Sequence, residues 1–194
     1  MIYLIYWKRL IHGIQEMNID EKIDNKFFDK NTHFLSGDVT TDSVEKIIRW
    51  ILYHNLDTTK KELTLYINSD GGTLVDAFGV IDLMQASIHD FKTVSVGSSM
   101  SAAFYILISG TKGKRYAGKY SSLMCHQFSA ECSMTKHHDT RAWVKENDNL
   151  SEKTQKILES AGLPKSYFKK FIGPTDFYLT SEQAKSYGVI DNIL

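Results

Sequence analysis

Cysteine and proline are the scarcest residue types in this sequence, with two of each among 194 residues. Cys125 and Cys132 have no CxxC spacing, which argues against a disulfide framework and against a structural zinc site. A chain without such a framework fits a reducing compartment, so we expect a cytoplasmic protein. Pro164 and Pro174 are accompanied by no Gly/Ser-rich linker, so we expect one main domain.

The sequence also lacks net charge and long apolar runs. Its 23 Lys and Arg residues balance its 23 Asp and Glu residues, so no overall field would attract nucleic acid or an anionic membrane. The longest apolar run, from Ala102 to Ile108, is far shorter than the roughly 20 residues that cross a bilayer. The N-terminal MIYLIYW is followed by its basic residues and has no small-residue cleavage site, so it does not read as a secretory signal. Neither nucleic acid nor a membrane is an expected partner.

Residues that form a core are abundant. Of the chain, 42% is hydrophobic and 12% is aromatic, which suits one compact domain. The polar segment from Asn18 to Asn31 is the exception, because its charges and weak periodicity predict a mobile region that ends before the core begins near Phe34. We therefore divide the chain into a mobile N-terminal segment, residues 1–33, and a folded domain, residues 34–194.

Helical and strand patterns alternate along the folded domain. This alternation predicts an α/β fold with a parallel sheet, helices outside the sheet and right-handed crossovers. The first helix is predicted by a capping-box-like start at Asp42 and Glu45 and by an apolar stripe of Val44, Ile47, Ile48, Ile51 and Leu52. Further helices are expected at 74–85, 100–109 and 139–161 and after the capping box of Thr180 and Gln183, and strands at 63–67, 91–97, 115–117, 122–126 and 189–194.

Two strand-to-helix turns are the first places to look for a site, because ligands of open α/β sheets bind at the carboxyl ends of strands. The turn from Ser69 to Gly72 holds two glycines that let a substrate approach backbone N–H groups, although a Gly-Gly pair can be a tight turn and nothing more. The turn from Gly97 to Ser101 opens a buried helix with a serine near the positive end of its dipole, although that serine can be an ordinary N-cap.

A nucleophilic serine needs a base and a residue that orients the base. His126 ends the strand SSLMCHQ, where it could face the serine turn, although a histidine on a strand is more often structural. Asp176, in the turn after Gly173 and Pro174, could fix the tautomer of this histidine, or could simply bond the backbone of its turn. The other histidines considered, His33, His89, His137 and His138, are expected to be solvated.

Together these motifs resemble the proteolytic subunit of Clp protease, ClpP. The second glycine precedes the serine by 29 residues and the serine precedes the histidine by 25, which is similar to the spacing in that family. The resemblance covers roughly residues 34–194. Its motifs, in the order of the family, are Tyr66 to Gly72, Gly97 to Ser101, Gly113 to Arg115, Met124 to Gln127, and Asp176 with Ala184 and Tyr187 to Asp191.

The resemblance implies a role for each matching residue. It implies a ClpP/crotonase-like βαβ superhelix with a parallel sheet and a protruding handle helix from the segment after Asp139, and neither a metal nor a cofactor. Ser101 would be the nucleophile, His126 the base and Asp176 the orienting carboxylate. The backbone amides of Gly72 and Ala102 would form an oxyanion hole, and substrate contacts are implied at Gly71, Gln127 and Phe128.

The activity implied is that of a serine endopeptidase acting on peptides and unfolded proteins inside a homo-oligomeric, heptameric ring fed by an AAA+ unfoldase. Thr175 replaces an arginine that the family often has before the aspartate, a position tied to contacts between subunits. The positions that match the family's unfoldase-docking surface are mixed: Tyr66 and Tyr116 are aromatic, whereas Thr64, Ala86 and Gly118 are small or polar. Three alternatives stay open: a catalytically silent subunit of a mixed ring, a crotonase-like acyl-CoA enzyme, and a membrane-linked or capsid-processing peptidase of the same fold.

Overall fold

The computed structural model describes residues 18–130 and 136–194. The chain divides into two compact units, one ending at Thr32 and one from His33 to Leu194, and each is considered by itself. The predictions for residues 1–7, for Cys132 and for the side chains of His137 and His138 lie outside the described residues.

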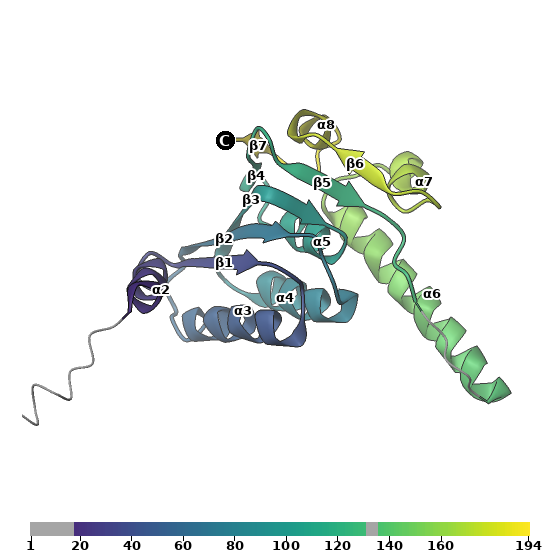
Figure 1. The fold of residues 1–194 in the computed structure, drawn as a ribbon, viewed down its shortest axis with the longest axis horizontal. Coiled ribbons are helices and arrows are strands. Elements are labelled where there is room, and N and C mark those ends of the chain that lie inside the picture. Colours follow the sequence, from purple (N-terminus) through teal and green to yellow (C-terminus); the bar gives the residue numbers. More distant parts are fainter. Residues whose placement is uncertain (1–17, 131–135) are drawn as a thin grey trace, which may run out of the picture. The chain divides into compact units, whose positions relative to one another are not determined.

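The first unit contains the helix α2 (Ile19–Asp29), drawn in purple in Figure 1. Its N-cap Asn18 accepts the N–H of Glu21 at 2.8 Å, and the Glu21 carboxylate accepts the N–H of Asn18 at 3.0 Å. This reciprocal capping box starts a helix that the weak apolar periodicity did not predict. The mobility expected for this segment stays a prediction.

The second unit is built on a sheet of mostly parallel strands, which confirms the predicted α/β class (Figure 1). β3 is its central strand and pairs in parallel with β2 on one side and with β4 and β5 on the other. β6 runs antiparallel to β5, a pairing that the sequence did not predict. The described strands are β1 (Thr32–Ser36), β2 (Glu62–Ser69), β3 (Asp90–Met100), β4 (Arg115–Ala117), β5 (Ser122–Cys125), β6 (Phe177–Leu179) and β7 (Asn192–Ile193), in the order β1-β2-β3-β4-β7 with β5 and β6 off this path.

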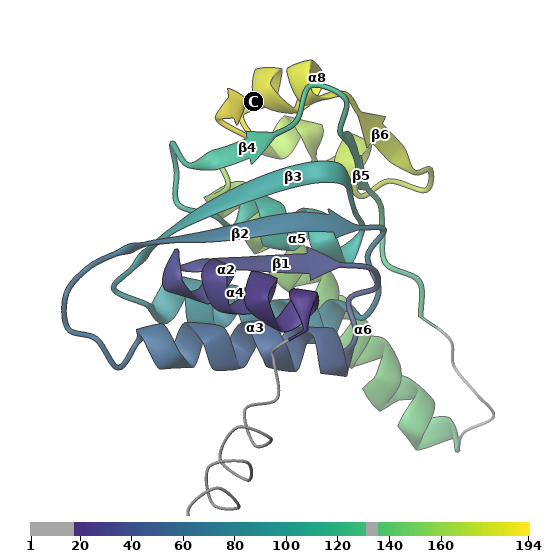
Figure 2. The same ribbon diagram turned by 60° about the vertical axis from the view of Figure 1, so that its left-hand side comes forward.

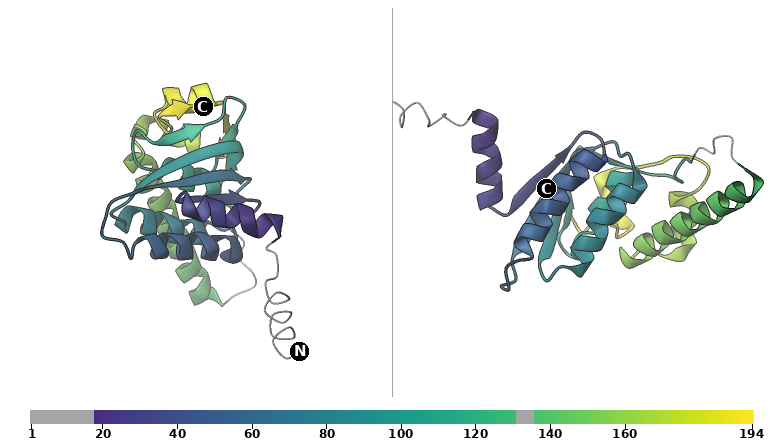
Figure 3. Two further views of the ribbon diagram at one scale, coloured as in Figure 1. Left: turned by 90° about the vertical axis from the view of Figure 1, so that its left-hand side faces the viewer. Right: turned by 90° about the horizontal axis from the view of Figure 1, so that it is seen from below.

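The predicted helices of the second unit occur in the predicted order, whereas the short helical segments directly after Pro164 were not predicted. Figure 2 shows α3 and α4 beneath the strands β1 to β3, and Figure 3 shows these two helices side by side. The buried helix α5 packs on β3 and against α4. The described helices are α3 (Thr41–His54), α4 (Leu74–Ala86), α5 (Ala102–Ile108), α6 (His137–Ser160), the 3₁₀ turn η1 (Lys165–Tyr167), α7 (Phe168–Phe171) and α8 (Ser181–Ser186).

The central strand β3 is longer than predicted. The segment Gly97–Ser101, expected to be a turn, is strand as far as Met100. Gly97, with a φ of 87°, bends β3 without ending it, a conformation that glycine adopts without a steric penalty. Before the bend Ser95 aligns with β4, and after it Ser98 aligns with β5. Because of this bend, β3 pairs with β4 before Gly97 and with β5 after it, so the carboxyl end of β3 lies next to β5.

The helix α5 is buried on all sides, as its uninterrupted apolar sequence predicted. All seven residues of α5 are buried, and Phe104 and Ile106 are fully inaccessible. The helix begins at Ala102, two residues later than expected, because β3 occupies the segment up to Met100. A helix placed this deeply gives the residue at its N-terminus a rigid support.

The helix α3 confirms the predicted stripe with two corrections. Its capping box is formed by Thr40 and Ser43, and not by Asp42 and Glu45. Leu52, predicted to face the core, is 49% exposed, whereas Trp50 is buried beside the stripe. The stripe is thus shifted toward Trp50, where the indole ring packs edge-on against Phe91 of β3.

His89 corrects the prediction of solvated histidines, because it is 4% exposed. Its Nδ1 accepts the N–H of Lys61 at 3.1 Å, and its Nε2 lies 2.8 Å from the carbonyl oxygen of His54. These two contacts tie the start of β3 to the residue before β2 and to the end of α3. His33, also expected in solvent, is half-buried and stacks on Trp50.

The longest helix, α6, extends beyond the edge of the sheet in Figure 1, as expected of a handle. It starts two residues before the predicted Asp139 and ends where Gly162 was expected to stop it. The N–H of Leu163 donates to the carbonyl of Leu158 at 3.0 Å, and that of Gly162 donates to Glu159, which closes the helix end. Within the described residues no helix is both long and apolar enough to span a bilayer.

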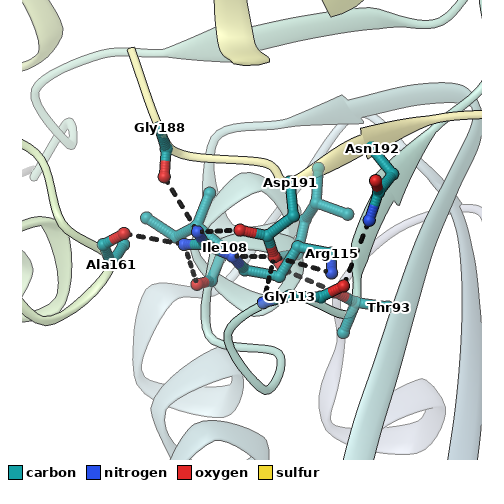
Figure 4. A network of polar contacts seen from close by, with 9 residues as sticks. Thr93, Ile108, Gly113, Arg115, Ala161, Gly188, Asp191 and Asn192 are labelled. Carbon is teal, nitrogen blue, oxygen red and sulfur yellow. Dashed lines mark hydrogen bonds and ion pairs between the residues drawn. The ribbon is translucent and has the colours of Figure 1, made fainter. Parts of the chain in front are cut away.

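The motif Gly113 to Arg115 has a structural role that Figure 4 shows in detail. The Arg115 side chain is 2% exposed and forms two hydrogen bonds to the Asp191 carboxylate, at 2.9 and 2.8 Å. Its remaining N–H groups donate to the carbonyls of Ile108, Ala161 and Gly188. One guanidinium therefore joins β4 to the ends of α5, α6 and α8.

Candidate active site

Ser101 lies between the end of β3 and the first residue of α5. Its backbone has a φ of 52° and a ψ of −122°, an unusual conformation for a residue with a side chain. Such strain costs roughly 1–3 kcal/mol and is typical of functional sites. The Ser101 side chain forms no capping hydrogen bond, although the residue occupies the N-cap position of α5. The alternative of an ordinary N-cap serine therefore does not describe this residue.

The parallel pairing of β3 with β5 brings His126 to Ser101. Met100 is opposite Met124, and the N–H of Ser101 donates to the carbonyl of Met124 at 2.9 Å. His126, the first residue after β5, has its Nε2 2.8 Å from the Oγ of Ser101. The His126 side chain is 24% exposed, so a substrate can reach this pair from solvent.

The antiparallel strand β6 brings Asp176 to the other side of the imidazole. Cys125 is opposite Phe177 in the β5–β6 pair, so the residues next to them, His126 and Asp176, lie side by side. The Nδ1 of His126 is 3.3 Å from the Oδ1 of Asp176, and the Asp176 side chain is 51% exposed. An Nδ1–H donated to this carboxylate leaves Nε2 as the acceptor that faces Ser101.

The first of the two glycines after β2, Gly71, lies directly beside the serine. A Cβ atom on Gly71 would be 2.7 Å from both the Cβ of Ser101 and the carbonyl oxygen of Met100, so only glycine fits there. The amide of Gly72 forms no hydrogen bond within the described part of the chain. The amide of Ala102, at the first position of α5, has no partner inside its helix. Two backbone donors thus lie on the segments that flank Ser101.

Three residues, Gly71, Gln127 and Phe128, were expected to contact a substrate. Gly71 touches Ser101, as described above. Gln127 and Phe128 follow His126 on a segment without regular structure, where Gln127 is exposed and Phe128 is half-buried. Their contact with a substrate stays a prediction.

Three neighbours of the site were given no individual role in the prediction from sequence. Ser69 is 2% exposed, and its Oγ accepts the N–H of Gly71 at 3.1 Å, which shapes the glycine turn. Asn68 accepts the N–H of Ser98 at 3.1 Å and supports the bend of β3. Val39 bridges to Gly72 from the loop after β1. Ser69 and Asn68 belong to the motif from Tyr66 to Gly72. No pattern in the sequence near Val39 indicates that this residue contacts Gly72.

Cys125 precedes His126 but is not suited to act as a nucleophile. Its thiol is fully buried and lies 3.6 Å from the hydroxyl of Tyr105. Burial raises the pKa of the Cys125 thiol to about 12, so the thiolate is scarce at neutral pH. Among the described residues no group of three or more His, Cys, Asp or Glu side chains is arranged to hold a metal ion.

The chain is similar in sequence to proteins of one known family. The sequence model of the Clp protease family matches residues 15–194. An ATP-dependent Clp protease proteolytic subunit 1 from Prochlorococcus marinus subsp. pastoris is 34% identical over 168 residues, which cover 83% of this chain and 82% of the relative. A protein of the same name from Thermobifida fusca is 32% identical over 190 residues, which cover 97% of this chain and 83% of the relative.

Proposed function

Because the chain belongs to the Clp protease family, we propose that it is a serine endopeptidase in which Ser101, His126 and Asp176 form the catalytic triad. The observation that carries this proposal is the continuous line of polar contacts from Ser101 Oγ to His126 Nε2, at 2.8 Å, and from His126 Nδ1 to Asp176 Oδ1, at 3.3 Å. A serine hydroxyl is a weak nucleophile, and a base within hydrogen-bonding distance is what activates it.

In the proposed reaction the Ser101 Oγ attacks the carbonyl carbon of a peptide bond while His126 Nε2 takes the hydroxyl proton. Asp176 holds the imidazole in the required tautomer and stabilises the imidazolium. His126 then gives the proton to the leaving amine as the C–N bond breaks, which leaves an acyl group on Ser101. A water molecule, deprotonated by the same imidazole, hydrolyses this ester and restores the serine.

The negative charge on the carbonyl oxygen needs donors that are already in place. We assign this role to the amides of Gly72 and Ala102, for which no hydrogen bond is found within the described residues. In serine proteases the loss of one such donor reduces kcat by about 10²–10³-fold.

Family membership also supports an assembled form of the enzyme. We propose that the chain forms a homo-oligomeric ring, heptameric in the family it resembles, that admits peptides and unfolded chains. In this proposal an ATP-dependent unfoldase supplies the unfolded chains. Of the positions considered for docking, Tyr66 and Tyr116 are half-buried and Thr64, Ala86 and Gly118 offer little apolar surface.

The first test combines labelling and hydrolysis. Wild-type protein should gain the mass of one phosphonyl group from a small fluorophosphonate and should hydrolyse a short fluorogenic peptide. The Ser101→Ala variant should do neither, because it lacks the attacking oxygen. Intact-mass spectrometry and particle size, measured on the same samples, check the result.

Ser98→Ala is the matched control, since Ser98 lies on β3 three residues before Ser101 and its hydroxyl makes a 3.4 Å contact with Asn68. This variant should label and hydrolyse like the wild type. Turnover by Ser101→Ala at the wild-type rate would refute the assignment of the nucleophile. An assembled wild-type ring that neither labels nor hydrolyses would instead favour the silent structural subunit.

A further inference from the structure

Val39, in the loop between β1 and α3, is tied to both sides of Gly72. The N–H of Val39 donates to the carbonyl of Gly71 at 2.8 Å, and the carbonyl of Val39 accepts the N–H of Thr73 at 2.8 Å. These bonds form an isolated parallel bridge between Val39 and Gly72. The Val39 side chain is 1% exposed, so the bridge is anchored in the core.

The carbonyl of Gly71 and the N–H of Gly72 belong to the same peptide group. A peptide group is planar and trans, so its carbonyl and its N–H point in opposite directions. The hydrogen bond from Val39 holds the carbonyl on the side of the β1–α3 loop. It therefore turns the Gly72 amide away from this loop, where no described hydrogen bond occupies it.

The two glycines fill the space between Val39 and the serine. A Cβ atom on Gly72 would be 2.3 Å from the carbonyl oxygen of Val39, and one on Gly71 would be 2.7 Å from the Cβ of Ser101. Glycine backbone rotates freely, so a Gly–Gly peptide needs an external contact to keep one orientation. Val39 is that contact.

The loop that carries Val39 is itself held at both ends. The N–H of Gly37 donates to the carbonyl of Asn68 at 3.0 Å. The hydroxyl of Ser43, in the first turn of α3, donates to the carbonyl of Asp38 at 2.9 Å. The loop can therefore transmit the rigidity of α3 and β2 to the glycine turn.

We propose that Val39 is a positioning residue for the reaction: its backbone N–H holds the Gly71–Gly72 peptide in the orientation that directs the Gly72 amide at the oxyanion. This inference rests on the proposed function. An oxyanion exists in the transition state and not in the bound substrate, so a loosened donor lowers kcat and leaves KM unchanged.

The test removes the backbone N–H of Val39 and leaves its side chain and its carbonyl in place. Valine at position 39 is replaced by its α-hydroxy analogue, which converts the amide into an ester. We expect kcat for a short fluorogenic peptide to fall at least about tenfold, toward the 10²–10³-fold that marks complete loss of a donor. KM should stay within about twofold. The affinity for a peptide aldehyde, whose adduct with Ser101 carries the same oxyanion, should fall by the same factor as kcat/KM.

The ester also weakens the Asp38 carbonyl as an acceptor for Ser43. Ser43→Ala is therefore the matched control, because it removes that bond and keeps the Val39 N–H; its kcat should fall far less than that of the ester protein. A folded ester protein with wild-type kcat would overturn the inference, as would equal losses in the ester and in Ser43→Ala. An aldehyde affinity that stays constant while kcat falls would also overturn it. A wild-type chain that neither hydrolyses nor binds the aldehyde would instead sink the proposed function, and this inference with it.

Discussion

At the scale of single residues, the site depends on side chains whose environment the local sequence does not reveal. Ser101 adopts a positive φ because α5 begins immediately after it and β3 ends immediately before it. His89 and Cys125 are buried for similar reasons, since the elements around them cover residues that a one-dimensional pattern leaves undecided. The strain at Ser101 and the inert thiol of Cys125 are both consequences of packing.

Asp176→Asn tests the orienting carboxylate at this scale. An asparagine in this position would stabilise the wrong tautomer of His126, and in a well-studied serine protease such a change reduces kcat about 10⁴-fold. Since the Asp176 side chain is 51% exposed, the midpoint of thermal unfolding should not change. Steady-state hydrolysis and a thermal melt on the same preparation measure both. Asp148→Asn, an exposed site on α6, is the control; an unchanged rate in Asp176→Asn would move the orienting role to another residue.

At the scale of elements, the pairing of strands and the closure of helix ends position the site. β5 pairs with β3 on one side and with β6 on the other, so His126 stands between Ser101 and Asp176. The Arg115 network ties the strand β4 to the ends of three helices and to the turn that carries Asp191. Removing either partner of this ion pair would leave a charge buried without compensation.

Asp191→Asn should therefore lower the free energy of unfolding by about 3 kcal/mol at neutral pH. Burial raises the pKa of Asp191. Hydrogen bonds from the Arg115 side chain and backbone lower this pKa by a larger amount, so that it lies below its ordinary value of 3.8. The contribution is present above that ordinary pKa and is lost as the pH falls through the lowered one.

Chemical denaturation of both proteins at pH 7 and in strongly acidic buffer would measure the difference, which should shrink in acid. Asp57→Asn is the control, because the Asp57 carboxylate pairs with Lys61 at the surface and its loss should leave stability nearly unchanged. A difference between wild type and Asp191→Asn that is independent of pH would contradict the electrostatic account.

At the scale of the whole molecule, Ser101 and His126 lie at the carboxyl ends of β3 and β5. Family membership implies that this site works inside an oligomer. We expect a particle of seven 22.2 kDa chains, or a multiple of seven, by native mass spectrometry. Peptide hydrolysis should follow the assembled fraction as the protein is diluted. A fully active monomer would contradict the proposed ring.

Much of this protein could be predicted from its sequence. Apolar periodicity identified α3, α4 and α6, an uninterrupted apolar run identified α5, and the capping residues Thr180 and Gln183 identified α8. These features depend on neighbours within a few residues, so a linear pattern contains the information. The spacing of the serine, histidine and aspartate motifs was enough to name the candidate triad, because it resembles the order of a known family.

Other features were decided only by the tertiary structure. The bend at Gly97, the antiparallel pairing of β6 and the bridge from Val39 to Gly72 each join segments distant in sequence. Such contacts depend on how the strands and α5 pack together, and the free energy that selects them is shared among many residues. The sequence by itself therefore determined which residues are proposed to carry the chemistry, whereas the folded chain determined the distances and orientations at which they lie.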